Sequence, residues 1–366
     1  MKIEDFQVRV VHPEGMGFQI GKHLWVDQCM VLLTIRTDDG AEGIAGCTTY
    51  GPGMSVAYAL KDIVGPSLLE RDPFEREALW QSWFRLMKLY LSPQAIAVAD
   101  LALWDLAGKV LGQPVHRLLG TYRTTLTAYG STLTYPEIPE FVEKVAGFVD
   151  QGFQAIKLHT YGVPDKDIEL CRQVRAAVGD NIALMIDAAG HYEIADALRV
   201  GRALEELNYE WMEMPIEDPF MGGYVDLARD LDISVTTGEV TQSTLTEAAS
   251  ALARGAWDIV RVDVCNSGGI TGARKTAALA EAYGRRCELH SWGFVITQLA
   301  NFQAMCAVPN CRYFEMPVPV GIFDYGMEGL KLNSDGTVTI PDRPGLGQVF
   351  DMEAMEAATI AKFGRD

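Results

Sequence analysis

The chain has 366 residues, with 31 lysines and arginines against 49 aspartates and glutamates, so its formal net charge is −18. This charge argues against a nucleic-acid-binding protein, because little positive charge is available to neutralise phosphates. Hydrophobic residues make up 48% and charged residues 22%, which is ordinary for a globular protein with a large core. The length suits one barrel of about 250 residues and a smaller domain. An anionic substrate stays possible, because a bound divalent metal reverses the local charge.

The seven cysteines are odd in number and scattered, without a CxxC pair. This pattern predicts reduced thiols in a cytoplasm rather than a disulfide framework. Residues 1–6 lack the apolar core of a signal peptide. The most apolar stretch, residues 95–106, carries Asp100 and Asp105 and is too short to span a bilayer. We therefore expect a cytoplasmic protein with no membrane partner.

The first 50 residues are predicted to be β structure. Extended runs at 30–37 and 41–48 flank an Asp-Asp-Gly turn at 38–40, which is a strong hairpin signal. The pattern is helical from residue 55 to residue 120. Residues 1–125 are therefore predicted to form a small α+β domain.

After residue 125, short apolar segments alternate with amphipathic helical stretches. Eight such segments occur, at 126–128, 155–158, 182–186, 211–214, 233–236, 259–262, 287–289 and 313–314. Eight strands separated by helices is the count of a closed parallel (β/α)8 barrel. A doubly wound open sheet alternates in the same way, so the count favours the barrel without excluding the sheet. We predict a barrel over residues 126–320 and a segment over 321–366 that returns to the first domain.

Three carboxylates, Asp187, Glu213 and Glu239, end three successive predicted strands. They are 26 residues apart in both cases, which is one strand–helix–strand step, so the side chains should meet at one rim of the barrel. Active sites of such barrels lie at the C-terminal ends of the strands. Converging carboxylates repel one another unless a cation lies between them, and an all-oxygen ligand set is typical of Mg²⁺. The alternative, helix caps or salt bridges, does not explain the equal intervals.

Other polar groups end four of the five remaining predicted strands. Lys157 and His159 are two residues apart on the second strand and should both face inward; a surface lysine is the alternative. Asp263 and His290 end the sixth and seventh strands, where a carboxylate bonded to an imidazole orients the ring and raises its basicity. A structural histidine is the alternative there. Glu315 ends the eighth strand, where a protonated or hydrogen-bonding carboxyl would stabilise developing negative charge.

Taken together, these residues resemble the mandelate racemase subgroup of the enolase superfamily. The resemblance is carried by residues 102–109, 112–114 and 118–120, by Asp187, Glu213-Met214-Pro215, Gly238-Glu239, Asp263 with Gly268-Gly269, His290 and Glu315, and by Pro344-Gly345-Leu346-Gly347. It implies a modified (β/α)7β barrel with an α+β capping domain formed by the N-terminal region and the C-terminal tail. It also implies bound Mg²⁺, a small-molecule carboxylate substrate and a homo-oligomer, an octamer or smaller. The muconate cycloisomerase subgroup has a lysine on the sixth strand instead of Asp263.

Two positions depart from the family pattern. The family usually has Lys-x-Lys on the second strand, and this chain has His159 at the second lysine, which keeps a base there. The residue two after the first metal ligand is usually Asn and is here Ala189, which removes a polar support.

The resemblance implies abstraction of the proton α to a carboxylate, with Mg²⁺, Lys157 and Glu315 stabilising the enediolate. His290, oriented by Asp263, would lie on one face of the substrate and His159 on the other. Dehydration of a sugar acid to a 2-keto-3-deoxy acid is the favoured reaction by analogy with the subgroup, and racemisation is the alternative. A metallohydrolase would need more histidines at strand ends. A non-catalytic binding protein would have no use for the candidate bases.

Specificity is expected from two loops of the first domain that close over the barrel mouth. One is residues 15–28, with His23 and Trp25 as candidate substrate-binding residues. The other is residues 47–53, with Tyr50. Ordinary surface loops are the alternative.

Overall fold

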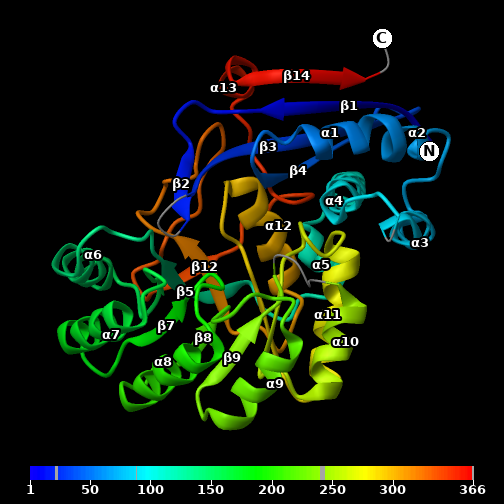
Figure 1. The fold of residues 1–366 in the computed structure, drawn as a ribbon. Coiled ribbons are helices and arrows are strands. Elements are labelled where there is room, and N and C mark those ends of the chain that lie inside the picture. The colour runs from blue at the N-terminus through cyan, green and yellow to red at the C-terminus, as the bar shows by residue number, and fades with distance from the viewer. Residues whose placement is uncertain (21–23, 88, 240–243, 365–366) are drawn as a thin grey trace.

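The computed structural model describes residues 1–20, 24–87, 89–239 and 244–364, and Figure 1 shows an antiparallel sheet with helices packed against a barrel. The antiparallel sheet has the order β14-β1-β3-β2, with β4 on the other edge of β3. Its N-terminal strands are β1 (Ile3–Val11), β2 (Gly17–Ile20), β3 (Leu24–Thr37) and β4 (Glu42–Tyr50). The predicted hairpin is confirmed, because β3 and β4 pair directly and Gly40 in the turn has a φ of 86°.

The helices of the capping domain are α1 (Met54–Ala59), the π-helical turn η1 (Leu60–Val64), α2 (Gly65–Leu68), α3 (Arg76–Met87), α4 (Pro93–Leu111) and α5 (Val115–Leu119). Helix α4 begins where the Ser92 side chain accepts a hydrogen bond from the Ala95 amide, and it ends at Gly112 in the left-handed conformation. Its middle is buried on all sides, which explains the apolar run at 95–106. Among the described residues, no helix is both long enough and apolar enough to cross a membrane.

The barrel strands are β5 (Thr125–Ser131), β6 (Ala155–His159), β7 (Ala183–Asp187), β8 (Trp211–Glu213), β9 (Ser234–Thr237), β10 (Ile259–Val262), β11 (Arg286–Leu289) and β12 (Tyr313–Pro317). Each overlaps a predicted segment. Pairing runs β11-β10-β9-β8-β7-β6-β5-β12, all parallel, and β11 also contacts β12. Because the first strand pairs with the eighth, the sheet curls into a barrel, and the doubly wound alternative is wrong.

Seven helices follow the first seven barrel strands: α6 (Ile138–Asp150), α7 (Pro164–Val178), α8 (Ile194–Glu206), α9 (Met221–Asp230), α10 (Leu245–Arg254), α11 (Ile270–Ala282) and α12 (Val295–Met305). In the described residues after β12, the next helix is the short α13 (Met352–Ala357). The predicted (β/α)7β barrel with an α+β capping domain is therefore confirmed, and Figure 1 shows the helices around the strands.

The C-terminal segment contributes one strand to the barrel and one to the capping sheet. Strand β13 (Thr337–Thr339) pairs with β5 of the barrel, and β14 (Thr359–Gly364) pairs with β1 of the capping sheet. Figure 1 shows β14, in red, beside β1, in blue. Of the segment predicted to return to the first domain, β14 thus lies on the capping sheet, while β13 lies on the barrel. The predicted domain boundaries stay a prediction.

The buried carboxylate of Asp105 connects segments that lie far apart in the chain. Asp105 on α4 accepts hydrogen bonds from the amides of Ile44 and Leu346, both at 2.9 Å. Gly345, beside Leu346, has a φ of 73°, and a Cβ there would lie 2.2 Å from Oδ1 of Asp105. Glycine is therefore required at this position both by the backbone and by the close approach.

Candidate active site

The three predicted metal ligands meet at the C-terminal rim of the barrel. Asp187 ends β7 and Glu213 ends β8, and the parallel register places one opposite the other. Glu239 follows β9 by two residues. One carboxylate oxygen from each acid lies within 4.8 Å of those of the other two, and all three residues are buried. Equal spacing in the sequence thus does bring the three acids together.

The electrostatics of this acidic cluster fit a divalent cation. Burial, together with the neighbouring Glu213 and Asp187 carboxylates, holds the pKa of Glu239 well above its ordinary value. Oε2 of Glu239 is buried and meets no hydrogen-bond donor among the residues that the structure describes. A bound cation would offset both costs, because three acids attract it and it would satisfy that oxygen. All the donors are carboxylate oxygens, the type of ligand that Mg²⁺ takes.

Lys157 lies inside the barrel mouth and is only 1% exposed, which rules out a surface lysine. Its Nζ lies 2.8 Å from Oε1 of Glu213, 2.8 Å from Oε1 of Glu315 and 3.6 Å from Oδ2 of Asp187. Burial lowers the pKa of Lys157, but Glu213 and Glu315 outweigh the burial and hold that pKa well above its ordinary value. The lysine therefore carries a fixed positive charge beside the acidic cluster.

A second buried cation, Arg261, is missing from the sequence-based site. Its Nη2 donates to Oε1 of Glu213 at 3.0 Å and to Oε2 of Glu315 at 3.1 Å, and its Nη1 donates to the Tyr129 hydroxyl at 3.1 Å. The signal in the sequence is an arginine within the apolar strand Ile259–Val262. A charged residue in such a strand is almost never fully buried unless it is paired.

Both carboxylate oxygens of Glu315 accept hydrogen bonds from neighbouring side chains and from one backbone amide. Oε1 accepts from Nζ of Lys157 and from the Ser131 hydroxyl at 2.9 Å, and Oε2 accepts from Arg261 and from the Ser291 amide at 3.1 Å. Burial raises its pKa, but Lys157 and Arg261 outweigh the burial and hold the pKa of Glu315 well below its ordinary value. Of the two forms that the sequence left open, protonated or hydrogen-bonding, these contacts favour a hydrogen-bonding Glu315 that accepts from its neighbours and positions Lys157.

Asp263 and His290 form the contact that the sequence predicts. Oδ2 of Asp263 lies 2.9 Å from Nδ1 of His290. Since a carboxylate only accepts, Nδ1 carries the proton and Nε2 remains for a substrate. Oδ1 of Asp263 accepts from the Cys265 amide at 2.8 Å and from Nδ2 of Asn301 at 2.9 Å. Asn301, on α12, is a further residue that sequence reasoning missed, because α12 packs behind the loop after β10 only in the folded chain.

His159, the last residue of β6, faces the acidic cluster. Its Nδ1 lies 2.5 Å from the Thr132 carbonyl oxygen, so Nδ1 donates and Nε2 is directed toward Oδ2 of Asp187 at 3.3 Å. Its ring lies 4.9 Å from the Trp292 ring, between centroids. Burial raises the pKa of Asp187, but Lys157 and His159 outweigh the burial and lower it. His159 thus presents Nε2 to the acidic cluster at the barrel mouth, and its role as a base stays a prediction.

The predicted specificity loops are described in part. His23 lies outside the described residues, and Trp25 lies in β3 opposite Gln19 of β2. Tyr50 ends β4 and lines a cavity of about 320 Å³ together with Asp263 and Trp292. The second loop therefore lies beside the C-terminal end of the barrel strands, and substrate binding by Tyr50 stays a prediction.

A parallel barrel with a buried acidic triad, two inward-facing cations and an Asp–His pair at its mouth defines an enzyme of the enolase type. The chain matches the mandelate racemase / muconate lactonizing enzyme N-terminal domain over residues 5–120 and the enolase C-terminal domain-like family over residues 140–354. It belongs to this family and is an enzyme of the enolase superfamily.

Relatives of known activity are similar over most of their length. The chain is 32% identical to the 3,6-anhydro-alpha-L-galactonate cycloisomerase of Streptomyces coelicolor, covering 88% of this chain and 90% of that one. It is 30% identical to the arabinonate dehydratase of Saccharolobus solfataricus, covering 87% of each. A solved structure of D-glucarate dehydratase from Agrobacterium tumefaciens complexed with magnesium is 33% identical, with a TM-score of 0.86 over 99% of this chain and 100% of that one.

Proposed function

We propose that the enzyme binds Mg²⁺ through Asp187, Glu213 and Glu239 and dehydrates a sugar acid to a 2-keto-3-deoxy acid. The observation that carries this proposal is the pair of imidazoles, His159 and His290, beside a buried acidic cluster whose donors are all oxygens. It is supported by relatives that are named as dehydratases of sugar acids and by one solved with magnesium.

When bound, Mg²⁺ supplies positive charge that stabilises the negative charge gained by the substrate carboxylate as the α-proton leaves. Lys157 adds a second positive charge at the same place, because its ammonium group is fixed between Glu213 and Glu315. Arg261 keeps Glu213 and Glu315 in position from the other side. This arrangement holds the carboxylate end of the substrate.

His159 takes the α-proton through Nε2. The Thr132 carbonyl holds the proton on Nδ1, so Nε2, which faces the acidic cluster, is the nitrogen through which His159 exchanges a proton with the substrate. The contact with the Trp292 ring limits rotation of the imidazole. The C–H electron pair then moves onto the substrate carboxylate.

His290 protonates the leaving group. Nδ1 is held by Asp263, so the imidazolium donates from Nε2 to the β-hydroxyl oxygen as the C–O bond breaks, and water leaves. The resulting enol becomes the 2-keto-3-deoxy acid when carbon 3 takes up a proton and the hydroxyl on carbon 2 loses one. Atoms balance: one sugar acid gives one keto acid and one water.

A second candidate is racemisation, which the same pair of imidazoles favours. If the substrate has no β-leaving group, the base opposite can return a proton to the α-carbon and invert it. The two candidates share the first step and differ in product, so product analysis separates them.

The experiment is a screen of aldonates and aldarates with Mg²⁺, in which 2-keto acid formation and α-proton exchange in D₂O are followed by NMR. His290→Asn should stop dehydration and still exchange the α-proton, whereas His159→Asn should do neither on the same acid. If no acid exchanges its α-proton with the unmodified enzyme, the proposed function is wrong. If His159→Asn keeps full turnover, His290 is the base and His159 is only a polar wall.

We also propose a cytoplasmic homo-oligomer, an octamer or smaller. All seven cysteines are buried and free, which suits a reducing compartment. Large apolar side chains such as Leu89, Tyr90 and Phe220 are more than 60% exposed, which suits covered surfaces between copies. Light scattering during size-exclusion chromatography tests this, and a monomeric mass would contradict it.

A further inference from the structure

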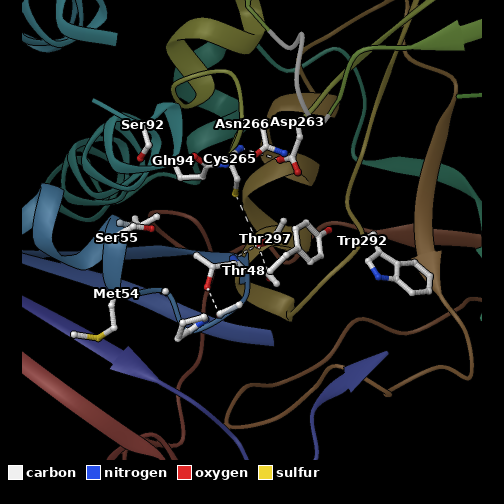
Figure 2. A pocket seen from close by; sticks show the side chains of 16 residues that line it. Thr48, Met54, Ser55, Ser92, Gln94, Asp263, Cys265, Asn266, Trp292 and Thr297 are labelled. Atoms are coloured by element: carbon white, nitrogen blue, oxygen red, sulfur yellow. Dashed lines mark hydrogen bonds between the residues drawn. The ribbon is translucent and has the colours of Figure 1, made fainter. Parts of the chain in front are cut away.

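A groove of about 400 Å³ lies where α3 and α4 of the capping domain meet α11 of the barrel. Figure 1 shows these three helices on the same side of the molecule. The residues of the groove that matter here are Arg76, Trp104, Thr271, Arg274 and Lys275. No described residue of the groove lines the cavity beside Tyr50, which Figure 2 shows, so the groove is separate from the candidate active site.

The groove is positively charged, although the net charge of the chain is −18. Three cations, Arg76, Arg274 and Lys275, line it together with one carboxylate, that of Glu77. Glu77 forms an ion pair with Lys275, so these two charges offset each other. The two arginines remain, one from each domain.

The guanidinium of Arg76 is fixed in place but lacks an acceptor. Its central carbon lies 4.0 Å from the centroid of the Trp104 ring, and its Nη1 is buried and meets no hydrogen-bond acceptor among the described residues. Burial lowers the pKa of Arg76, and the nearby carboxylate of Asp100 opposes this effect. Both oxygens of Asp100, however, accept from Thr271. An oxyanion in the groove would offset the cost of burying this cation without an acceptor.

Arg274 supplies the second cation from the opposite wall. It is exposed on α11 and forms no ion pair with a described carboxylate. Thr271, one turn earlier on the same face of α11, accepts a hydrogen bond from the Trp104 indole at 3.2 Å, which joins the two walls. The planar fork of an arginine matches the oxygens of a carboxylate or a phosphate, so two arginines facing one groove suit such a group.

We propose that this groove binds a small oxyanion, a phosphate or a carboxylate group, between Arg76 and Arg274. Because Arg76 belongs to the capping domain and Arg274 to the barrel, the bound anion connects the two domains and stabilises the folded enzyme. The site does not depend on the reaction proposed above, since it shares no described residue with the candidate active site.

The first test titrates the unmodified enzyme, with Mg²⁺ present, with inorganic phosphate and with acetate. Sodium chloride keeps the ionic strength constant, so that screening does not change. Calorimetry should show saturable binding, and the melting temperature should rise with the concentration of the bound anion. Tighter binding of phosphate identifies a phosphate group as the ligand, and tighter binding of acetate identifies a carboxylate. If neither anion binds saturably or raises the melting temperature, the inference is overturned.

The second test locates the binding. Arg76→Met keeps an apolar chain against Trp104 and removes the charge, so the Kd of the better anion should rise by at least about tenfold. Arg274→Gln should raise it by about threefold, since this cation is exposed, and the exposed position keeps the fold safe even if Arg76→Met fails to fold. Arg85→Gln, exposed on α3 outside the groove, is the matched control and should leave Kd unchanged. Anion binding that neither groove variant weakens comes from another place, such as the active site, and overturns the inference.

Discussion

Around the acidic cluster, the role of a residue depends on which charged groups it contacts, and Glu213 is the example. Oε1 of Glu213 accepts from both Lys157 at 2.8 Å and Arg261 at 3.0 Å, and its other oxygen accepts from the Trp211 indole at 3.1 Å. Glu213 thus connects the candidate metal site to both buried cations by hydrogen bonds. The negative charge of Glu213 is needed both for cation binding and for pairing with Lys157 and Arg261, because removing one member of a buried ion pair leaves an uncompensated charge.

Glu213→Gln should therefore lose both metal and activity while the fold is kept. Mg²⁺ binding should weaken by more than about 100-fold, since even the outer partners of metal ligands contribute about 10–100-fold. Calorimetry for Mg²⁺ and circular dichroism for the fold check this. Glu217→Gln, exposed in the loop after β8, is the control. Full activity of the unmodified enzyme after exhaustive chelation would refute the metal site altogether.

Ala189 shows what replaces the usual asparagine of the family. Its backbone amide donates to Oδ1 of Asp187 at 2.8 Å, so the main chain supplies a polar support to Asp187 in place of the missing asparagine side chain. This geometry requires a φ of 49° at Ala189. A left-handed backbone costs alanine about 1–2 kcal/mol and costs asparagine less.

Ala189→Asn should accordingly raise stability by about 0.5–1 kcal/mol, and Ala189→Val should lower it by more than about 1 kcal/mol, because β-branched residues resist this backbone conformation. Thermal denaturation of the three proteins under one set of conditions measures the difference. Equal changes in melting temperature for the Asn and Val variants would show that the side chain does not relieve backbone strain at this position.

Among the elements, α12 depends on the capping domain for its first turn. Its N-cap, Phe294, offers no side-chain hydrogen bond, and the Phe294 amide donates instead to Oγ1 of Thr48 on β4, at 2.9 Å. Thr48 also bonds Thr297. Because α12 carries Asn301, which binds Asp263, a contact between domains supports the Asp263–His290 pair that we propose as catalytic.

Thr48→Val removes this hydroxyl while keeping the shape of the side chain. We expect a loss of about 1–3 kcal/mol in stability, since buried donors lose their partner, and a lower kcat as α12 shifts. Thr48→Ser keeps the hydroxyl and should retain most of both. Thermal denaturation and steady-state kinetics measure the two effects. A valine variant with unchanged stability would mean that water or another group caps α12 equally well.

For the molecule as a whole, buried carboxylates of α4 tie the capping domain to the barrel. Asp100 accepts from the Thr271 amide at 3.0 Å and from the Thr271 hydroxyl at 2.6 Å, at the start of α11. Burial raises the pKa of Asp100 to about 6, against the opposing effect of these hydrogen bonds. The junction between domains therefore contains a group that titrates in a mildly acidic range.

The sign of the pH dependence follows from this raised value. An unfolded aspartate has a pKa of about 3.9, so the contribution of Asp100 is full below about pH 4 and is lost as the pH rises through 6. The loss approaches about 3 kcal/mol, for a shift of about two units. Asp100→Asn, which can keep both bonds to Thr271, should therefore gain stability relative to the unmodified enzyme as the pH rises.

Melting temperatures at pH 5 and pH 8 test this, and the difference between variant and unmodified enzyme should be more positive at pH 8. Asp180→Asn, in the exposed loop after α7, is the control and should show the same difference at both values. A difference for Asp100→Asn that does not change with pH would mean that Asp100 is ionised at no cost in the native state.

The sequence by itself determined the hairpin and the meeting of Asp187, Glu213 and Glu239, and it favoured a barrel whose closure the pairing of β5 with β12 then decided. These features depend on local periodicity and on the nearly constant length of one strand–helix unit, so distance along the chain fixes position on the rim. The Asp263–His290 contact follows from the same regularity, because neighbouring strands bring their ends together.

Only the tertiary structure decided what surrounds those residues. The ionisation of Glu315, the buried Arg261, and the support of Asp263 by Asn301 depend on side chains from strands and helices that meet only after the barrel closes. The cavity beside Tyr50 depends in addition on how the capping domain sits on the barrel. Periodicity reports which face of its own element a residue occupies, whereas charge pairing and pocket shape depend on distances between elements far apart in the chain.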